Sequence, residues 1–356
     1  MLLCMLNIQG CSSNIKGNNS EIKENANLGY PFEVEDYLGR KITISKPVKN
    51  IACGYAFTGH AVALFQRGQD IVAVVGGLQR DKILTTMYPH IKDLSVPFSS
   101  GAINIEELLM CKPDIAFIRR ETALNESEVS KLDKFNIPYV VVEFNSMEEQ
   151  MKSILLIGKI LGNEEKAKEY IKYYKDVIQG TQEIALTIPE SEKVTLFHSV
   201  NEAVRTSHTE SLPVDWIRIT GAINVSEGQE LKIQGDSSYA TLEQIYLWDP
   251  DFIIANEAGV SEYILTNEQW KGLKAVKEKK VFQIPNGISR WGHHGSIETP
   301  LAIIWTSKLL YPQYFHQIDM VQEIREYYRS FFNLSLSDEE INDILAGNGM
   351  RVPKER

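Results

Sequence analysis

The sequence is short of positive charge and of long apolar runs. Lys and Arg number 37 against 47 Asp and Glu, which gives a formal net charge of −10 at pH 7. This charge would repel a phosphate backbone unless a local basic patch overcame it, so no nucleic-acid partner is expected. After residue 11 there is no run of about 18 apolar residues, which excludes a channel or a permease.

Cysteine is also scarce, with four residues in the chain and no CxxC spacing. If Cys4 and Cys11 belong to a signal and an anchor, only Cys53 and Cys111 are left for the folded body. Two isolated cysteines in strand-like surroundings are typical of small buried hydrophobic side chains. They predict neither a disulfide nor a metal pair.

Common catalytic signatures are missing as well: the chain has no GxGxxG, HExxH or GxSxG. Residues 54–60 (GYAFTGH) have the two glycines of a phosphate loop, but His60 stands where that loop needs lysine. No pair of carboxylates stands out as an acid and a base. We therefore expect a protein that is not an enzyme and has no cofactor. A hydrolase or metalloenzyme on an α/β scaffold is the alternative from a different class.

What is present is an alternation of short β-branched runs with amphipathic stretches from residue 30 onward, which is typical of an α/β protein. The length of 356 residues predicts about two domains. Strands are expected at residues 32–34, 41–44, 50–53, 71–75, 114–118, 139–142, 194–197, 252–255 and 280–284. Helices are expected at 60–67, 213–220 and 299–310, with a helical pair over 320–345.

The N-terminal end differs from the rest of the chain. Residues 1–11 are apolar and uncharged and end in Ile-Gln-Gly-Cys, which resembles the lipobox of bacterial lipoproteins. The resemblance implies that Cys11 is lipidated and begins a mature protein anchored to a membrane outside the cytoplasm. The alternative is a frayed N-terminus with a chance cysteine. Residues 12–28 are polar and predict a flexible tether.

The middle of the chain predicts a connector between two similar halves. A helical pattern without a convincing strand covers 146–183 and predicts one long, stiff helix. Residues 104–118 align without gaps to 241–255, 137 positions later, and each copy predicts a helix that ends at Pro-Asp before a buried strand. The expected fold is α/β, with two similar Rossmann-like lobes joined by one long α-helix and a ligand cleft between them. The lobes are expected at 30–145 and 190–315, with a C-terminal helical tail over 316–356.

Together the lipobox, the tether, the two Pro-Asp motifs and the long helix resemble the class III periplasmic binding proteins. These are the solute receptors of ABC importers for ferric siderophores, haem and cobalamin. The resemblance covers residues 32–314, and its most specific pieces are 242–254 (LEQIYLWDPDFII) and 291–301 (WGHHGSIETPL). It implies a receptor that closes little on binding, because the connecting helix resists a wide hinge.

The resemblance also implies the partners, which are an ABC permease with its ATPase, a small-molecule solute, and the membrane through the lipid anchor. A ferric siderophore is the first expected solute, a corrinoid or haem the second, and an oxyanion such as molybdate or tungstate the third. In this family one acidic residue on each lobe docks on the permease, and the matching positions are Glu106 and Glu243. From the sequence alone, each glutamate could equally serve the dipole of its own helix.

Solutes of open α/β sheets bind beyond the carboxyl ends of the strands, so the loops after the predicted strands supply the candidate ligand-binding residues. In the first lobe these are Tyr55, Phe57, Arg80, Arg119 and Arg120. In the second lobe they are His198, Arg205, Arg290, Trp291, His293 and His294. The arginine side chains favour an anionic solute.

Some of these candidates have two interpretations. Adjacent Arg119 and Arg120 would point in opposite directions in a strand, so only one is expected to face the cleft. Trp291 is either a core plug or a stacking wall. Consecutive residues rarely chelate one ion, so we expect no metal site at His293 and His294, and a hydrogen-bonding role for at least one of them. Glu298, before Pro300, is expected to cap a helix.

Overall fold

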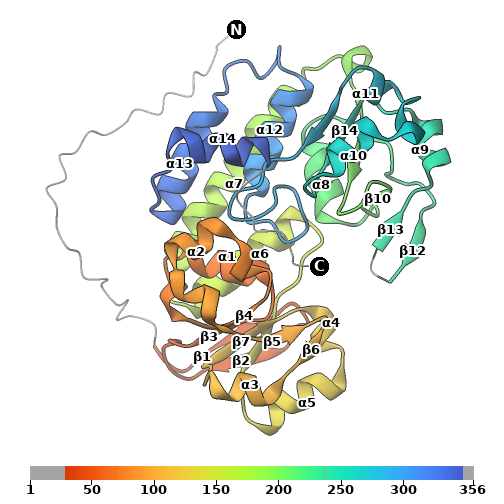
Figure 1. Ribbon diagram of the computed structural model, residues 1–356. Helices are drawn as coiled ribbons and strands as arrows, with labels where there is room; N and C mark the ends of the chain where they lie inside the picture. The colour runs from red at the N-terminus through yellow and green to blue at the C-terminus, as the bar shows by residue number, and fades with distance from the viewer. Residues whose placement is uncertain (1–28, 236, 348–356) are drawn as a thin grey trace, which may run out of the picture.

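The computed structural model describes residues 29–235 and 237–347 and divides them between two lobes, each built on its own sheet (Figure 1). In the view of Figure 1 the N-terminal lobe lies at the bottom and the C-terminal lobe at the upper right, with a group of helices beside and between them. The α/β fold with two Rossmann-like lobes is therefore confirmed. The predicted lipobox with Cys11 and the predicted tether lie outside the described residues.

The N-terminal lobe contains a mostly parallel six-stranded sheet in the order β6-β5-β4-β3-β7-β8, in which only β6 is antiparallel to its neighbour. A separate antiparallel hairpin precedes it, as expected. Its strands are β1 (Phe32–Glu35), β2 (Lys41–Ile44), β3 (Ile51–Cys53), β4 (Ile71–Val75), β5 (Ser95–Ser99), β6 (Ala102–Ile103), β7 (Ile115–Ile118) and β8 (Tyr139–Val141). Its helices are α1 (Ala56–Leu64), α2 (Lys82–Met87), α3 (Ile105–Met110), α4 (Arg120–Ala123) and α5 (Glu126–Lys134). Because β3, β7 and β8 are parallel, their carboxyl ends meet at one edge of the sheet.

The C-terminal lobe contains a parallel four-stranded sheet in the order β11-β9-β14-β15, and a small antiparallel sheet in the order β10-β13-β12. Its strands are β9 (Thr195–Ser199), β10 (Arg205–Thr206), β11 (Ile223–Asn224), β12 (Lys232–Gln234), β13 (Ser237–Tyr239), β14 (Phe252–Ala255) and β15 (Val281–Gln283). Its helices are α8 (Leu212–Ile219), α9 (Leu242–Trp248), α10 (Val260–Thr266) and α11 (Lys274–Lys277). The chain ends in α12 (Thr299–Leu310), α13 (Met320–Phe332) and α14 (Asp338–Ala346).

The internal repeat is a structural repeat with the same turn chemistry in both lobes. Asp114, between α3 and β7, accepts the backbone N–H of Asn50 at 2.9 Å through Oδ2. Asp251, between α9 and β14, accepts the backbone N–H of Thr195 at 2.8 Å in the same way. Each aspartate thus ties the helix-to-strand turn to the start of the neighbouring central strand, β3 or β9, and holds the two helices α3 and α9 in equivalent places.

The expected single helix over 146–183 is wrong in one respect, because the structure has two helices there: α6 (Met147–Ile160) and α7 (Glu164–Ala185). Gly162 separates them with φ of +73°, a left-handed conformation that ends α6. The apolar pattern continues across this break since both helices bury one face. The 22 residues of α7 span about 33 Å at 1.5 Å per residue, so α7 is the long connecting element.

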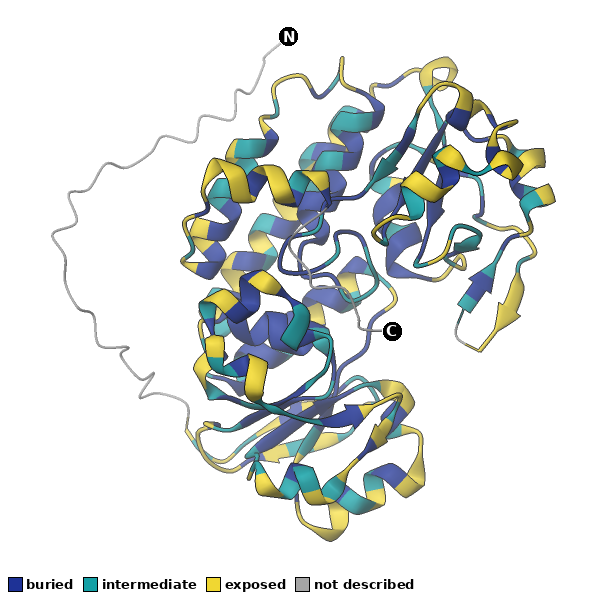
Figure 2. Cartoon of the chain, viewed as in Figure 1, coloured by how far each residue is buried: buried dark blue, intermediate teal, exposed yellow. Residues whose placement is uncertain are grey.

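Buried aromatic side chains hold α7 against the C-terminal helices. The rings of Tyr170 and Phe331 meet edge to face at 5.1 Å, and Tyr174 donates to Gln150 Oε1 at 2.9 Å. Gln150 in turn donates to the carbonyl of Ser296 at 2.9 Å. The connecting helices therefore fix the loop that precedes α12. Figure 2 shows this buried layer running from the lower sheet through the helical middle to the upper sheet.

Two further findings concern the described residues alone. Cys53 and Cys111 are both free thiols, the first buried and the second half-buried. None of the described helices combines the length and the apolar character that crossing a membrane requires.

Candidate functional site

Three side chains of the N-terminal lobe converge where the carboxyl ends of its strands meet. Tyr55 follows β3, Arg119 follows β7 and Glu143 follows β8. Gly54 allows this convergence, because its N–H donates to the Phe117 carbonyl at 2.8 Å and a Cβ at position 54 would stand 2.8 Å from that oxygen. The turn after β3 can therefore lie directly against β7, which brings Tyr55 close to Arg119.

Glu143 links this group to the segment that precedes α12. Its Oε1 lies 3.0 Å from Nε2 of His294, and its Oε2 lies 3.2 Å from Nη2 of Arg119. Burial raises the pKa of the Glu143 carboxyl, but the hydrogen bond from His294 and the charge of Arg119 outweigh burial and hold that pKa below its usual range. Glu143 is therefore a buried carboxylate between two nitrogen donors. We call Tyr55, Arg119, Glu143, Phe144 and His294 the junction cluster.

The junction cluster holds two buried groups without a hydrogen-bond partner in the described part of the chain, the Tyr55 hydroxyl and Nε of Arg119. The Arg119 guanidinium lies 5.1 Å from the centre of the Tyr55 ring. Burial raises the pKa of Tyr55, so its hydroxyl keeps its proton. Burial lowers the pKa of Arg119, but Tyr55 and Glu143 outweigh it and raise that pKa above its ordinary value. The Tyr55 hydroxyl and Nε of Arg119 are thus both hydrogen-bond donors, and a molecule with several acceptor oxygens could accept from both.

Aromatic rings support the junction cluster from behind. The Phe144 ring stacks on the His294 ring with centroids 5.2 Å apart, and Phe57 meets Phe144 edge to face at 4.6 Å. Phe57 is fully buried in this structure. Its ring supports Phe144 from the core, and the expected ligand contact of Phe57 stays a prediction.

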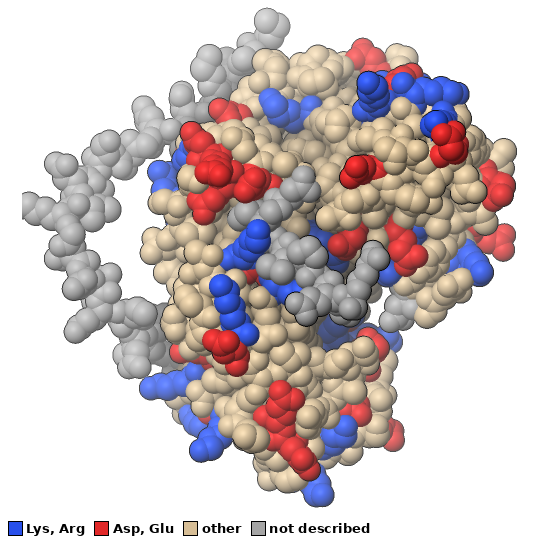
Figure 3. Space-filling view, in the orientation of Figure 1, with Lys and Arg blue, Asp and Glu red and all other residues tan. Residues whose placement is uncertain are grey.

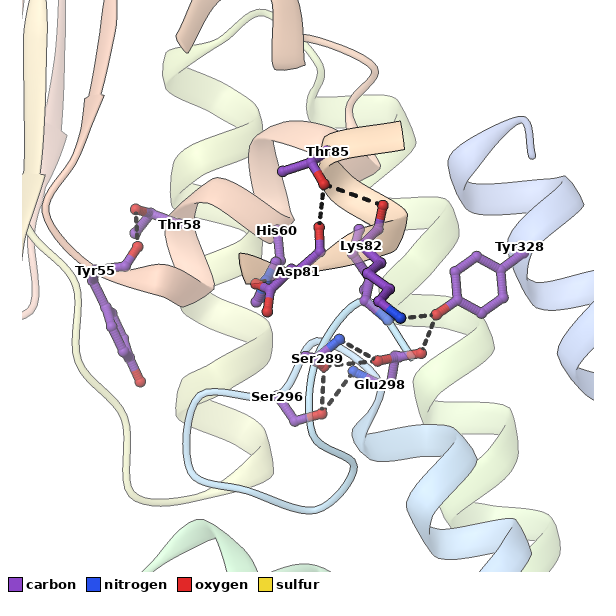
Figure 4. Close-up of polar contacts among 11 residues, drawn as sticks. Tyr55, Thr58, His60, Asp81, Lys82, Thr85, Ser289, Ser296, Glu298 and Tyr328 are labelled. Carbon is purple, nitrogen blue, oxygen red and sulfur yellow. Dashed lines mark hydrogen bonds and ion pairs between the residues drawn. The ribbon is translucent and has the colours of Figure 1, made fainter. Parts of the chain in front are cut away.

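A buried carboxylate holds the segment that carries His294. Glu298 is fully buried and accepts the N–H of Ser289 at 2.7 Å, the Ser289 hydroxyl at 2.8 Å and the Tyr328 hydroxyl (Figure 4). Desolvation by burial outweighs these hydrogen bonds and raises the pKa of Glu298. Glu298 occupies the N-cap position of α12, as expected, but its side chain makes no cap hydrogen bond and instead ties residues 287–297 to α13. Pro300 lies in the first turn of α12, as expected.

The C-terminal lobe brings a second set of candidates together. Arg290 donates to Asn201 Oδ1 at 2.7 Å and pairs with Glu257, so residues after β9 and β14 meet the segment before α12. His198 is buried against Trp216, with ring centres 5.7 Å apart, and burial lowers its pKa to about 4. Trp291 is fully buried, as a core plug would be, and a role as a stacking wall stays a prediction.

The remaining candidates lie on other elements. Of the adjacent arginines, Arg119 lies in the junction cluster and Arg120 is exposed at the start of α4. Arg80 ends a short 3-10 helix (Leu78–Arg80), and Arg205 lies in β10. His293 accepts the backbone N–H of Gly295 at 3.3 Å.

Within residues 29–235 and 237–347 no group of three or more His, Cys, Asp or Glu side chains is placed to hold a metal ion.

Glu143 and Phe144 are the site residues that the sequence analysis missed. They follow the predicted strand 139–142 directly, so the rule that placed candidates after strands would have included them. Glu106 and Glu243 lie in the first turns of α3 and α9, and both are exposed.

A shallow groove of about 470 Å³ begins next to Phe144 along the chain. One wall is formed by Asn145, Ser146 and Glu149, and the other by Thr209, Glu210, Ser211, Asp215 and Arg218. Three carboxylates and one arginine line it, which makes it a poorer place for an anion than the junction cluster. On the face shown in Figure 3, acidic and basic side chains are interspersed over both lobes and form no continuous basic stripe.

Comparisons with known proteins agree with this architecture. Residues 98–287 match the family model described as "Periplasmic binding protein". The molybdate-binding protein MolA of Haemophilus influenzae is 25% identical over 328 residues, 85% of this chain and 91% of MolA. The Fe(3+)-citrate-binding protein YfmC of Bacillus subtilis is 28% identical over 293 residues, 79% and 86% of the two chains.

Two solved structures show the same fold. A periplasmic solute binding protein from Veillonella parvula is 26% identical, with a TM-score of 0.75, over 88% of this chain and 96% of the other. The structure of Haemophilus influenzae MolA bound to molybdate is 22% identical, with a TM-score of 0.77, over 86% and 99% of the two chains.

Proposed function

The chain belongs to the periplasmic binding protein family, and we propose that it is the receptor of an ABC importer for an oxygen-rich, metal-containing anion. The solute binds between the lobes over 30–145 and 190–315, and the loaded receptor delivers it to the permease. Molybdate or tungstate is the first candidate solute. This order differs from the one expected from the sequence, in which a ferric siderophore was the first candidate and an oxyanion the third.

One observation carries this proposal: the junction cluster presents two buried hydrogen-bond donors, Nε of Arg119 and the hydroxyl of Tyr55, without an acceptor. A buried donor without a partner costs about 1–3 kcal/mol, so an acceptor that reaches both groups gains that free energy. An oxyanion offers four acceptor oxygens in a small volume, and its charge complements the guanidinium. A relative of similar length, named as molybdate-binding, supports the same choice.

A ferric chelate with carboxylate groups is the second candidate. Carboxylate oxygens would accept from the same two donors. The relative named as Fe(3+)-citrate-binding, with 28% identity, supports this alternative. Corrinoid and haem have no comparable support among the contacts of the junction cluster.

The location follows from the lipobox resemblance. We propose that the protein is an extracytoplasmic lipoprotein anchored through Cys11. A relative from Bacillus subtilis, 24% identical over 300 residues, is named as an ABC transporter substrate-binding lipoprotein, which supports this proposal. Globomycin treatment tests it: the unprocessed form should accumulate, and Cys11→Ser should release the protein from the membrane.

The solute is tested first by thermal unfolding with molybdate, tungstate, sulfate, ferric citrate, a ferric hydroxamate, haem and cobalamin. A ligand present at 100 times its Kd stabilises the native state by about 2.7 kcal/mol. We expect molybdate or tungstate to raise the Tm most. Stabilisation by haem or cobalamin alone would refute an anion receptor.

Calorimetry on matched arginine variants then tests the site. Arg119→Gln should weaken molybdate binding at least about tenfold, because it removes the guanidinium and its buried Nε donor. Arg120→Gln is the control, since Arg120 is exposed one residue later and its loss should change the Kd less than about twofold. Equal effects of the two substitutions would show that the solute does not bind at the junction cluster.

A further inference from the structure

Both copies of the internal repeat expose a large apolar side chain at the same position. Met110 ends α3 and is 82% exposed, and Leu247, in the last turn of α9 and 137 positions later, is 85% exposed. The opposite faces of the two helices are well packed, since Leu108 and Ile245 are fully buried. The exposure of Met110 and Leu247 therefore belongs to the motif and does not come from a loosely packed helix.

A single exposed apolar side chain needs no explanation, because such residues are normal on protein surfaces. Leu186, which lies outside the repeat and is 81% exposed, is one example. Two such residues at equivalent positions of the duplicated lobes differ from an isolated one, because each lobe carries a large apolar side chain at a solvent-exposed position where a polar side chain is usual. This duplication points to a partner that contacts both lobes in the same way.

An exposed acid accompanies each apolar residue. Glu106 and Glu243 stand four positions before Met110 and Leu247, which places the two members of each pair on the same helix face. Neither glutamate makes an ion pair within the described residues. The helix N-termini are already capped, by Asn104, which accepts the Glu107 N–H at 3.3 Å, and by Thr241, which accepts the Gln244 N–H at 3.2 Å. Glu243 also hydrogen-bonds its own backbone N–H and the Thr241 side chain, contacts that lower its pKa. Both acids nevertheless lie on the surface and carry a charge that a partner can meet.

We propose that Met110 and Leu247 are apolar anchors of the docking surface for the permease, each seated in an apolar recess beside a basic residue on one half of a two-fold permease dimer. This proposal rests on the proposed function. The charge of the two acids indicates which partner binds. Exposed carboxylates repel an anionic lipid surface and a second copy of this acidic chain, and they complement a basic protein surface. The duplication selects a partner with two equivalent halves.

The rigidity of the two helices fits such a role. Asp114 and Asp251 tie the turns after α3 and α9 to the central strands β3 and β9, so each acid–apolar pair is held on its own sheet. The proposal requires that the connecting helices α6 and α7 keep the two pairs at a nearly constant separation. A dimer of fixed geometry can therefore recognise both pairs at once.

Photo-crosslinking in cells of the source bacterium tests the proposal with the full chain and its native partners. p-Benzoylphenylalanine replaces Met110, Leu247 or, as the matched control, Leu186, and parallel variants carry it at Glu106 or Glu243. Adducts are identified by mass spectrometry. We expect positions 110 and 247 to crosslink to equivalent peptides of an ABC permease subunit at least fivefold more than position 186. Purified variants should keep the wild-type Tm, because each replaced side chain is exposed.

The outcomes separate this proposal from the function on which it rests. Permease adducts at 106 and 243 but none at 110 and 247 would overturn the apolar anchors and leave the receptor function intact. Permease adducts at none of the four positions would overturn both. Adducts from 110 and 247 to lipid or to another copy of the chain would replace the permease as the occupant and refute the proposal.

Discussion

Glu143 and His294 stand 151 residues apart in the chain, yet Glu143 Oε1 lies 3.0 Å from His294 Nε2. The other carboxylate oxygen of Glu143 lies 3.2 Å from Arg119. A solute anion would therefore meet a guanidinium that already neighbours a negative charge. Glu143 has two roles in this arrangement: it joins the N-terminal lobe to the segment before α12, and it moderates the attraction of Arg119 for anions.

The first prediction concerns that moderation. Glu143→Gln removes the buried negative charge and keeps an oxygen that accepts from His294, so molybdate should bind at least about threefold more tightly. Isothermal titration calorimetry measures the change. Glu121→Gln is the control, because Glu121 is 4.0 Å from Arg119 but its side chain is 53% exposed and screened. Weaker binding by Glu143→Gln would mean that the Glu143 charge holds Arg119 in its binding position.

The second prediction concerns the pH dependence of stability. His198 takes up a proton near pH 6.5 when unfolded, but burial lowers its native pKa to about 4. Between these values the unfolded state binds more protons, so the free energy of unfolding falls as the pH drops from 6.5 towards 4. From pH 7.5 to 5.0 this group alone should cost about 2 kcal/mol. Urea unfolding of His198→Phe should lack that loss; an identical pH dependence in both proteins would refute it.

The third prediction concerns the contact between α6 and α7. A Cβ at Gly158 would stand 2.6 Å from the Ala167 Cβ, so Gly158→Ala should destabilise the protein by about 1–2 kcal/mol. Gly180, within α7, has open space around its Cα, and Gly180→Ala should stabilise by about 0.5–1 kcal/mol through helix propensity. Guanidinium unfolding midpoints measure both changes. Stabilisation by both substitutions would show that the two helices are not closely packed at Gly158.

The fourth prediction concerns the buried carboxylate of Glu298. Glu298→Ala leaves the Ser289 N–H, the Ser289 hydroxyl and the Tyr328 hydroxyl without an acceptor, and should cost about 2–4 kcal/mol of stability. Glu298→Gln keeps one acceptor oxygen and removes a charge that burial disfavours, so its loss should be less than half as large. Chemical unfolding compares them. Equal losses would mean that the shape and the single acceptor oxygen kept by glutamine contribute nothing, and that the intact carboxylate is required.

Much of the fold could be predicted from the sequence because its signals are local. The apolar runs that form β7 and β14 are buried along their whole length, and Pro-Asp follows both α3 and α9 before a strand. The resemblance to class III periplasmic binding proteins is confirmed by the family match over residues 98–287 and by the two-lobed solved structures. The break at Gly162 was missed because apolar residues recur at helical spacing on both sides of it.

Short polar strands could not be predicted in the same way. All three residues of β12 are exposed, and β10 has only two residues, so neither has an apolar pattern to read. These strands exist because their backbone groups pair with β13. β12 lies only two residues before β13 and β10 about 30 residues before it, but neither pairing leaves an apolar signal in the sequence.

The sequence by itself determined the fold class, the duplicated halves and the loops that carry candidate residues, because apolar runs and helix-stop residues act over a few neighbours. Only the tertiary structure decided which side chains from those loops meet. It placed Arg119 beside Tyr55 and turned Arg120 to solvent, buried Phe57 and Trp291, and brought Glu143 to His294. Such meetings depend on how α6, α7 and α12 pack the lobes together, and that packing is a sum of many distant contacts that no local pattern encodes.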